Sequence, residues 1–192
     1  MPVPAGRGRG GGDRTGRPHR TTNTPQLPED PEARARELCL RMLTSRPRTR
    51  AELHRTLLRR GIEAEVAERV LSRFDEVGLI DDATFAETWV RSRHTYQGLG
   101  RRALAAELRR RGVADSVVAE AVAEVDADAE EERARQLVRR RLPSVAGRDE
   151  VTRVRRLVGM LARKGYSEGL ALRVVRDELR KAGEETELLD DC

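Results

Sequence analysis

Cysteine and histidine are scarce in this chain of 192 residues, which contains two cysteines and three histidines. None of them has a second ligand at helical spacing, and no cysteine pair completes a zinc site. A structural disulfide is not expected, because Cys39 stands on a predicted helical face and Cys192 is the last residue. We therefore expect no metal site, and a small buried thiol at Cys39.

Patterns of catalysis are missing as well. No nucleophile stands in a recognisable arrangement with a base, and most carboxylates stand one helical turn from an arginine, as on many exposed helices. The run of arginine and glycine at residues 7–12 is not a phosphate loop, because no Gly-Lys-Ser/Thr follows it and no strand precedes it. We predict that the protein is not an enzyme and has no catalytic residues, metal ligands or cofactor.

Long apolar runs are also absent. The amino terminus lacks the apolar stretch of a secretory signal, and no segment approaches the length of a membrane span. We expect a cytoplasmic protein without a membrane partner.

Aromatic residues number only two Phe, two Tyr and one Trp, against a hydrophobic content of 38% and a charged content of 37%. This balance suits thin helical layers better than one thick globular core. Phe74, Phe85, Trp89 and Tyr96 stand in or beside the middle third of the chain, with only Tyr166 elsewhere. We therefore predict that the middle third has the best-packed core and is the most rigid part.

What the sequence does contain is a segment repeated three times. Gly61, Gly112 and Gly165 recur about every 50 residues, a period that indicates stacked repeats. Each glycine has leucine eight and four residues before it, two basic residues directly before it and an apolar residue directly after it. Glycine closes a helix, and basic residues in the last turn offset the helix dipole. Apolar residues continue at helical spacing beyond the glycine, so a second helix follows each one.

A further helix precedes each pair, with apolar positions such as Leu38, Phe85 and Leu137. Asp82 and Asp128 are the predicted N-caps of this helix in the second and third copies. No strand is convincing, because the β-branched residues stand at helical spacing. We predict an all-α fold, an elongated, curved array of three tandem three-helix repeats. The repeats are expected at residues 32–80, 81–126 and 127–183, after a disordered basic Gly/Pro/Arg-rich tail at residues 1–31 and before an acidic tail at residues 184–192.

Charge is the remaining guide to a partner. The chain has 38 basic and 33 acidic residues and a formal net charge of +5, so the array is not uniformly positive. Repetition projects equivalent positions onto one side of the array, which predicts two basic rows. The first row contains Arg59, Arg60, Arg110, Arg111, Arg163 and Lys164, and the second contains Arg50, Arg101, Arg102, Arg153 and Arg155. Guanidinium groups bind phosphate or carboxylate bidentately, but dipole complementation explains part of the pattern, and a solvated face is the alternative.

The segment from Gly78 to Val113 resembles the central signature of the RecX regulatory proteins. The matching positions are residues 78–82, 89–90, 92–93, 107–108 and 111–113, together with Phe85, Gly100 and Leu104. The resemblance extends more weakly over residues 33–182, since that family is likewise built of three tandem three-helix repeats. Among the matched polar residues, Arg93 and Glu107 are candidate contacts, with a buried ion pair or a surface salt bridge as the alternative for each.

The resemblance implies a regulator that binds the RecA recombinase, lodges in the groove of its filament on DNA, and inhibits ATP hydrolysis, strand exchange and coprotease activity. It assigns no contact residues, so our candidates are Arg93 and the two basic rows, which also suit single- and double-stranded DNA. We expect a monomer, because an open-ended array lacks an obvious self-complementary patch. The alternatives are a sequence-nonspecific DNA-binding protein and a helical scaffold for another partner.

Overall fold

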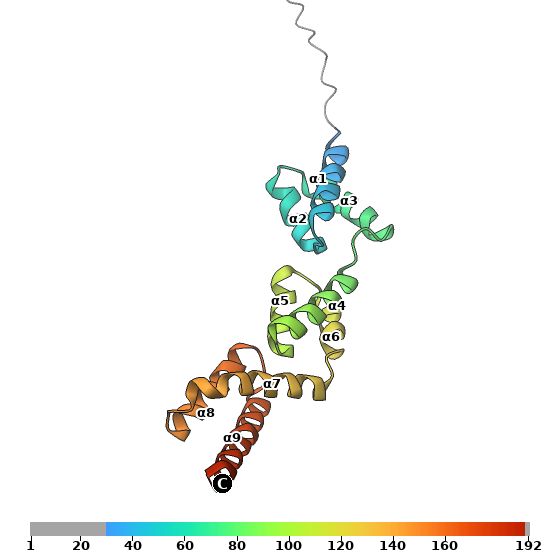
Figure 1. The fold of residues 1–192 in the computed structure, drawn as a ribbon. Coiled ribbons are helices and arrows are strands. Elements are labelled where there is room, and N and C mark those ends of the chain that lie inside the picture. Colours follow the sequence, from blue (N-terminus) through green and yellow to red (C-terminus); the bar gives the residue numbers. More distant parts are fainter. Residues whose placement is uncertain (1–29, 191–192) are drawn as a thin grey trace, which may run out of the picture.

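The computed structural model describes residues 30–190, and within that range it contains nine α-helices and no strand. The predicted N-terminal tail lies outside the described residues, apart from its last two positions. The helices form three units that follow one another along an elongated, bent body, with α7 lying across its long direction (Figure 1). This arrangement confirms the predicted all-α array of three tandem three-helix repeats.

The first unit contains α1 (Pro31–Ser45), α2 (Arg50–Arg59) and α3 (Ala64–Glu76); the second contains α4 (Asp82–Ser92), α5 (Arg101–Arg111) and α6 (Asp115–Ala123); the third contains α7 (Ala127–Arg141), α8 (Glu150–Arg163) and α9 (Glu168–Asp190). Helix α4 continues into a π-helical turn (Arg93–Gln97), and α7 into a short 3-10 helix (Leu142–Val145). Helix α9 runs past residue 183, where we expected the third unit to end, because the Glu and Leu residues that follow are good helix formers.

Each unit has its own hydrophobic core, and the repeated leucines lie at its centre. The leucines eight and four residues before each glycine are completely inaccessible to solvent: Leu53, Leu57, Leu104, Leu108, Leu157 and Leu161. The residues directly after the glycines, Ile62, Val113 and Tyr166, are buried as well. Since burying one such side chain stabilises a fold by about 1.5–3 kcal/mol, these positions account for the sequence period.

The aromatic residues do not gather in the middle unit, so the reason we gave for a best-packed and most rigid middle unit was wrong, and its rigidity stays a prediction. Phe74 belongs to the core of the first unit and Tyr166 to the core of the third, while Tyr96 is 82% exposed. Phe85 and Trp89 are only partly buried and pack at the edge of a middle core built from Ala, Val and Leu. Proximity in sequence misled the prediction because a residue near a unit boundary can point into either neighbour.

The first helices of the second and third units begin earlier than predicted. Asp81, not Asp82, caps α4 by accepting the N–H of Thr84 at 2.8 Å. Asp126, not Asp128, caps α7 by accepting the N–H groups of Asp128 and Ala129. In both cases an aspartate upstream of the predicted cap has the extended backbone that an N-cap needs.

The repeated glycines end their helices in the predicted way. Gly61, Gly112 and Gly165 have φ angles of 78°, 86° and 87°, in the left-handed region. In each copy, the N–H of the residue after the glycine donates to the carbonyl of the leucine four residues before the glycine, as Val113 does to Leu108 at 3.2 Å. This is the hydrogen-bonded turn in which glycine is favoured, since it has no Cβ.

Two of these glycines also join neighbouring units. A Cβ on Gly112 would lie 2.4 Å from Cβ of Ala51 at the start of α2, and a Cβ on Gly165 would lie 2.3 Å from N of Ala103 at the start of α5. Gly61 has nothing within 4 Å of the corresponding point. The C-terminal end of α5 therefore lies against the N-terminal end of α2, and that of α8 against that of α5. This head-to-tail order places the negative end of one helix dipole at the positive end of the next.

Candidate functional site

The predicted contact residue Arg111 is committed to the first junction, between units one and two. Its guanidinium Nη1 pairs with Oε1 of Glu52, and both side chains are largely buried, at 23% and 15% exposure. Its backbone carbonyl accepts the hydroxyl of Thr49 at 2.9 Å and Nη2 of Arg55 at 3.1 Å. Thr49 is also the N-cap of α2, so one hydroxyl serves the helix and the junction together.

Arg93 is engaged within the second unit, as the salt-bridge alternative predicted. Its Nε lies 3.6 Å from Oε2 of Glu107, which also accepts the indole N–H of Trp89 at 2.8 Å. The guanidinium carbons of Arg93 and Arg111 lie 4.1 Å and 3.7 Å from the centre of the Trp89 ring. Cation–π contacts of this kind contribute about 0.5–2 kcal/mol, which accounts for the position of both arginines.

A carboxylate from the second unit completes the first junction. Asp82 accepts the backbone N–H of Arg50, one of the unpaired donors at the start of α2, at 2.9 Å. Burial raises the pKa of Asp82 above its usual range, more than the hydrogen bond from Arg50 lowers it. The side chain of Arg50 pairs with Glu68 at 2.6 Å and with Asp75 at 3.2 Å.

Arg101 and Lys164 belong to the second junction, between units two and three. The backbone N–H of Arg101 donates to Oε1 of Glu130 at 2.8 Å, and its Nε donates to the carbonyl of Val125 at 2.9 Å. Lys164 donates from Nζ to the carbonyl of Gln97 at 2.7 Å. Glu130 therefore has the same role at this junction as Asp82 at the first, because each accepts a backbone N–H at the start of a helix in the preceding unit.

The second junction also uses backbone groups directly. The N–H of Gly100 donates to the carbonyl of Lys164 at 2.8 Å, and that of Arg102 donates to the carbonyl of Gly165 at 3.2 Å. The hydroxyl of the buried Tyr166 donates to the carbonyl of Gly98 at 3.1 Å. Burial raises the pKa of Tyr166 to about 12, so this hydroxyl keeps its proton at neutral pH.

The remaining members of the predicted rows face solvent or lie near the surface. Arg59 donates only to the hydroxyl of Thr56, at 3.1 Å in the same helix. The side chains of Arg60, Arg102, Arg110 and Arg163 are exposed and form no hydrogen bond or ion pair with any described residue. Arg153 is half-buried, and its Nε has no hydrogen-bond partner among the described residues. The structure thus separates the rows into arginines that hold the junctions and arginines that remain available.

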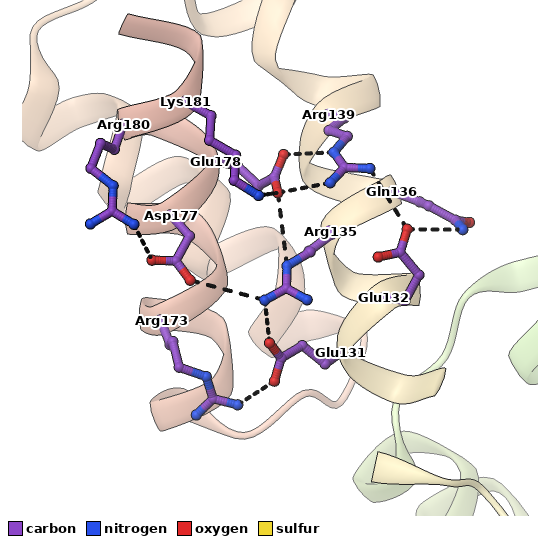
Figure 2. Close-up of polar contacts among 10 residues, drawn as sticks. All are labelled: Glu131, Glu132, Arg135, Gln136, Arg139, Arg173, Asp177, Glu178, Arg180 and Lys181. Carbon is purple, nitrogen blue, oxygen red and sulfur yellow. Dashed lines mark hydrogen bonds and ion pairs between the residues drawn. The ribbon is translucent and has the colours of Figure 1, made fainter. Parts of the chain in front are cut away.

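Helices α7 and α9 are joined by a network of charged residues (Figure 2). Glu178, which is 3% exposed, accepts two hydrogen bonds from Arg139, at 2.7 Å and 3.0 Å, and lies 3.8 Å from Nε of Arg135. Glu131 accepts from both Arg135 and Arg173. The hydrogen bonds from Arg139 hold the pKa of Glu178 below its usual range, and the bond from Arg173 does the same for Glu131. These arginines are neutralised within the fold.

Sequence reasoning missed a hollow in the third unit, with a volume of about 560 Å³. Its walls are Arg141, Arg155, Arg156 and Arg163, and its apolar lining is Val145 and Met160. The sequence does carry a signal for it, since basic runs end α7 and occupy the first half of α8. Only the packing of these two helices brings the runs together.

A second hollow, of about 420 Å³, lies beside the first junction. It has a different character, because Leu79, Phe85 and Trp89 contribute to its lining together with Arg46 and Arg48. Among residues 30–190, no group of three potential metal ligands converges, and none of the helices combines the length and apolarity that a bilayer span requires.

Comparison with protein families gives one consistent match. The models of the first, second and third three-helix domains of RecX match residues 35–74, 81–122 and 128–175. The matched segments coincide with the three units of the array, and together they cover more than half of the chain.

Relatives and solved structures agree with this match. Regulatory protein RecX of Streptomyces coelicolor is 57% identical over 164 residues, which cover 85% of this chain and 87% of the relative. Regulatory protein RecX of Thermobifida fusca is 59% identical over 160 residues, covering 83% and 86%. The crystal structure of RecX from Lactobacillus salivarius superposes with a TM-score of 0.73 at 18% identity, covering 78% of this chain and 97% of that one. The last similarity concerns the fold alone.

Proposed function

Because this chain belongs to the RecX family, we propose that it regulates the RecA recombinase by binding the recombinase filament on DNA. The regulation takes the form of inhibition of ATP hydrolysis, strand exchange and coprotease activity. The protein acts in the cytoplasm as a monomer and uses binding alone, without a reaction of its own.

The elongated array is the observation that carries this proposal (Figure 1). A body of this shape can contact more than one subunit of a helical polymer at once. A protein that bridges subunits stabilises one conformation of the polymer and opposes the rearrangements that a cycle of ATP hydrolysis needs. The exposed arginines supply contacts to carboxylates on the recombinase or to the phosphates of the DNA it encloses.

The direct test is ATP hydrolysis by the cognate recombinase on single-stranded DNA, measured with increasing amounts of this protein. We expect the rate to fall at substoichiometric amounts, since one bound array affects several subunits. A rate that stays constant at every ratio would exclude the proposed regulation.

Variants of the exposed arginines test where the filament is contacted. Arg102→Glu combined with Arg110→Glu should raise the concentration needed for half-inhibition about tenfold, which corresponds to about 1.4 kcal/mol. Arg101 and Arg111 are left unchanged, because they hold the junctions. Arg73→Glu combined with Arg91→Glu is the matched control, since both side chains are exposed and unpaired within the described residues. Equal effects of the two pairs would mean that only total charge matters.

A sequence-nonspecific DNA-binding protein is the second candidate, and the arginine-lined hollow of the third unit favours it. If DNA binding were the only function, the protein should bind naked DNA strongly, with an affinity that falls steeply with added salt. It should then affect the recombinase only by competing for DNA.

A further inference from the structure

The hollow between α7 and α8 has the composition of an anion site, and we propose that it binds the phosphate groups of a nucleic-acid backbone. This inference adds detail to the proposed function. It depends on that function in one respect, namely that the filament bound by the protein contains DNA. It assigns the DNA contact to the third unit and to four arginines, of which Arg141 and Arg156 belong to neither predicted row.

The charge in this hollow is all of one sign. Arg141 is the last residue of α7 and Arg163 the last residue of α8, while Arg155 and Arg156 stand in the first half of α8. Within the part of the chain that the structure describes, no carboxylate lines the hollow. Four guanidinium groups around about 560 Å³ repel one another when the hollow holds only solvent, and a bound anion removes that repulsion.

Three of these arginines are also unpaired. In the same unit, Arg135 and Arg139 form ion pairs with Glu178 (Figure 2). Arg141, Arg156 and Arg163, by contrast, have exposed side chains without a hydrogen bond or ion pair to any described residue. Asp149, the N-cap of α8, accepts the N–H of Thr152 at 2.9 Å, and this hydrogen bond, with a smaller contribution from the charge of Arg155, holds the pKa of Asp149 below its usual range. The fold therefore neutralises Arg135 and Arg139 of α7. It leaves Arg141 at the end of α7, and Arg156 and Arg163 of α8, free for a ligand.

The chemistry of the lining fits a sugar-phosphate chain. Each phosphodiester offers two charged oxygens to a planar guanidinium fork, and four arginines can hold more than one phosphate. The half-buried Met160 provides an apolar surface for the sugar between phosphates. No aromatic side chain among the described residues lines the hollow, so we expect no stacking of bases there and binding that is independent of sequence.

The test is the salt dependence of binding to a fluorescein-labelled oligothymidylate, measured by anisotropy. The variant Arg155→Gln/Arg156→Gln/Arg163→Gln should bind more weakly, and the slope of log K against log salt should become shallower by about 2, or about 0.7 for each lost phosphate contact. The matched control Arg73→Gln/Arg91→Gln/Arg176→Gln removes the same charge from exposed, unpaired arginines, two of which also stand in the last turn of a helix. The control should keep the slope of the natural chain.

The outcomes separate the alternatives. Equal changes of slope in both variants, or no change in either, would overturn the proposal. Helicity and the thermal midpoint are measured for each variant, and if the triple variant unfolds, the single Arg→Gln replacements are measured instead, each with an expected change of about 0.7 in slope. Thymidine monophosphate serves as a competitor: displacement of the oligonucleotide at equal phosphate concentration would assign the hollow to a free nucleotide.

A parallel assay of recombinase ATP hydrolysis distinguishes failure of this inference from failure of the proposed function. If the hollow variant lost inhibition but bound naked oligothymidylate as the natural chain does, the hollow would bind a carboxylate surface of the recombinase, and the inference would be wrong. If the natural chain left ATP hydrolysis unchanged while the slope behaved as expected, the inference would stand and the proposed function would fail.

Discussion

The two junctions of the array have the same geometry but are held by different groups. Both place the glycine turn of one unit on the helix start of the unit before it, and both use a carboxylate, Asp82 or Glu130, to accept a free backbone N–H at that start. The first junction adds side chains, above all the pair of Arg111 and Glu52. The second adds backbone hydrogen bonds from Gly100 and Arg102. The stability of the first junction therefore depends on the identity of its side chains. That of the second depends on how closely the two backbones approach each other.

The largest effect is expected where the backbones approach most closely. Gly165→Ala should destabilise the protein by about 3 kcal/mol or more, because the left-handed φ angle and a Cβ placed 2.3 Å from N of Ala103 act together. Gly61→Ala is the matched control, since it has a similar φ angle but open space around it, and it should cost about 1–2 kcal/mol. Urea unfolding followed by circular dichroism measures both. Equal losses would show that the second junction does not depend on the missing side chain.

A smaller effect is expected from the side-chain junction. Arg111→Met should cost about 2 kcal/mol, since Glu52 loses its close partner in a position only 15% exposed. The emission of Trp89, the only tryptophan of the chain, should change as well, because the guanidinium over its ring is removed. Arg110→Met, on the exposed neighbour, should change stability by less than about 0.5 kcal/mol and leave the emission unaltered. An unchanged midpoint in Arg111→Met would remove this pair from the account of the junction.

Acid should change the stability of the third unit and of the first junction in opposite directions, with the smallest effect of the three predictions. The pKa values of Glu178 and Glu131 lie below the usual 4.5, so the stability that they contribute to the third unit is lost as pH falls below 4.5 through their folded values. The pKa values of Asp82 and Asp75 lie above the usual 3.8, mainly because of burial, so protonation favours the folded first junction as pH falls through their folded values towards 3.8. Cleavage by pepsin in mildly acidic buffer should therefore begin in α7–α9. Earlier cleavage in α2–α4 would contradict this assignment.

Much of the fold could be predicted from the sequence because it depends on local periodicity. The spacing of leucine around Gly61, Gly112 and Gly165 determines which helix faces are buried, and those faces form the three cores. The second role of Gly112 and Gly165 was not predictable in the same way. Their contacts are with residues about 60 positions earlier in the chain, and the need for glycine in the turn already explained the pattern.

The candidate site was less predictable for a related reason. Arg110 and Arg111 are adjacent and chemically identical, yet one is exposed and the other is held between Glu52 and Trp89. Which arginine of a pair is engaged depends on the unit that precedes it. The exposed Arg60 illustrates this, because its unit has no preceding unit among the described residues. The role of each arginine in binding the filament stays a prediction.

The head-to-tail order of α2, α5 and α8 gives the body a direction, and it makes the middle unit special. Among the units of residues 30–190, this one alone contributes to both junctions, with a glycine turn towards the first unit and a helix start towards the third. If the middle unit were duplicated, the glycine turn of the second copy could pack on the helix start of the first copy, as in the existing junctions. The length of polymer that such a molecule contacts would then increase by one unit at a time, and no new kind of contact would be needed.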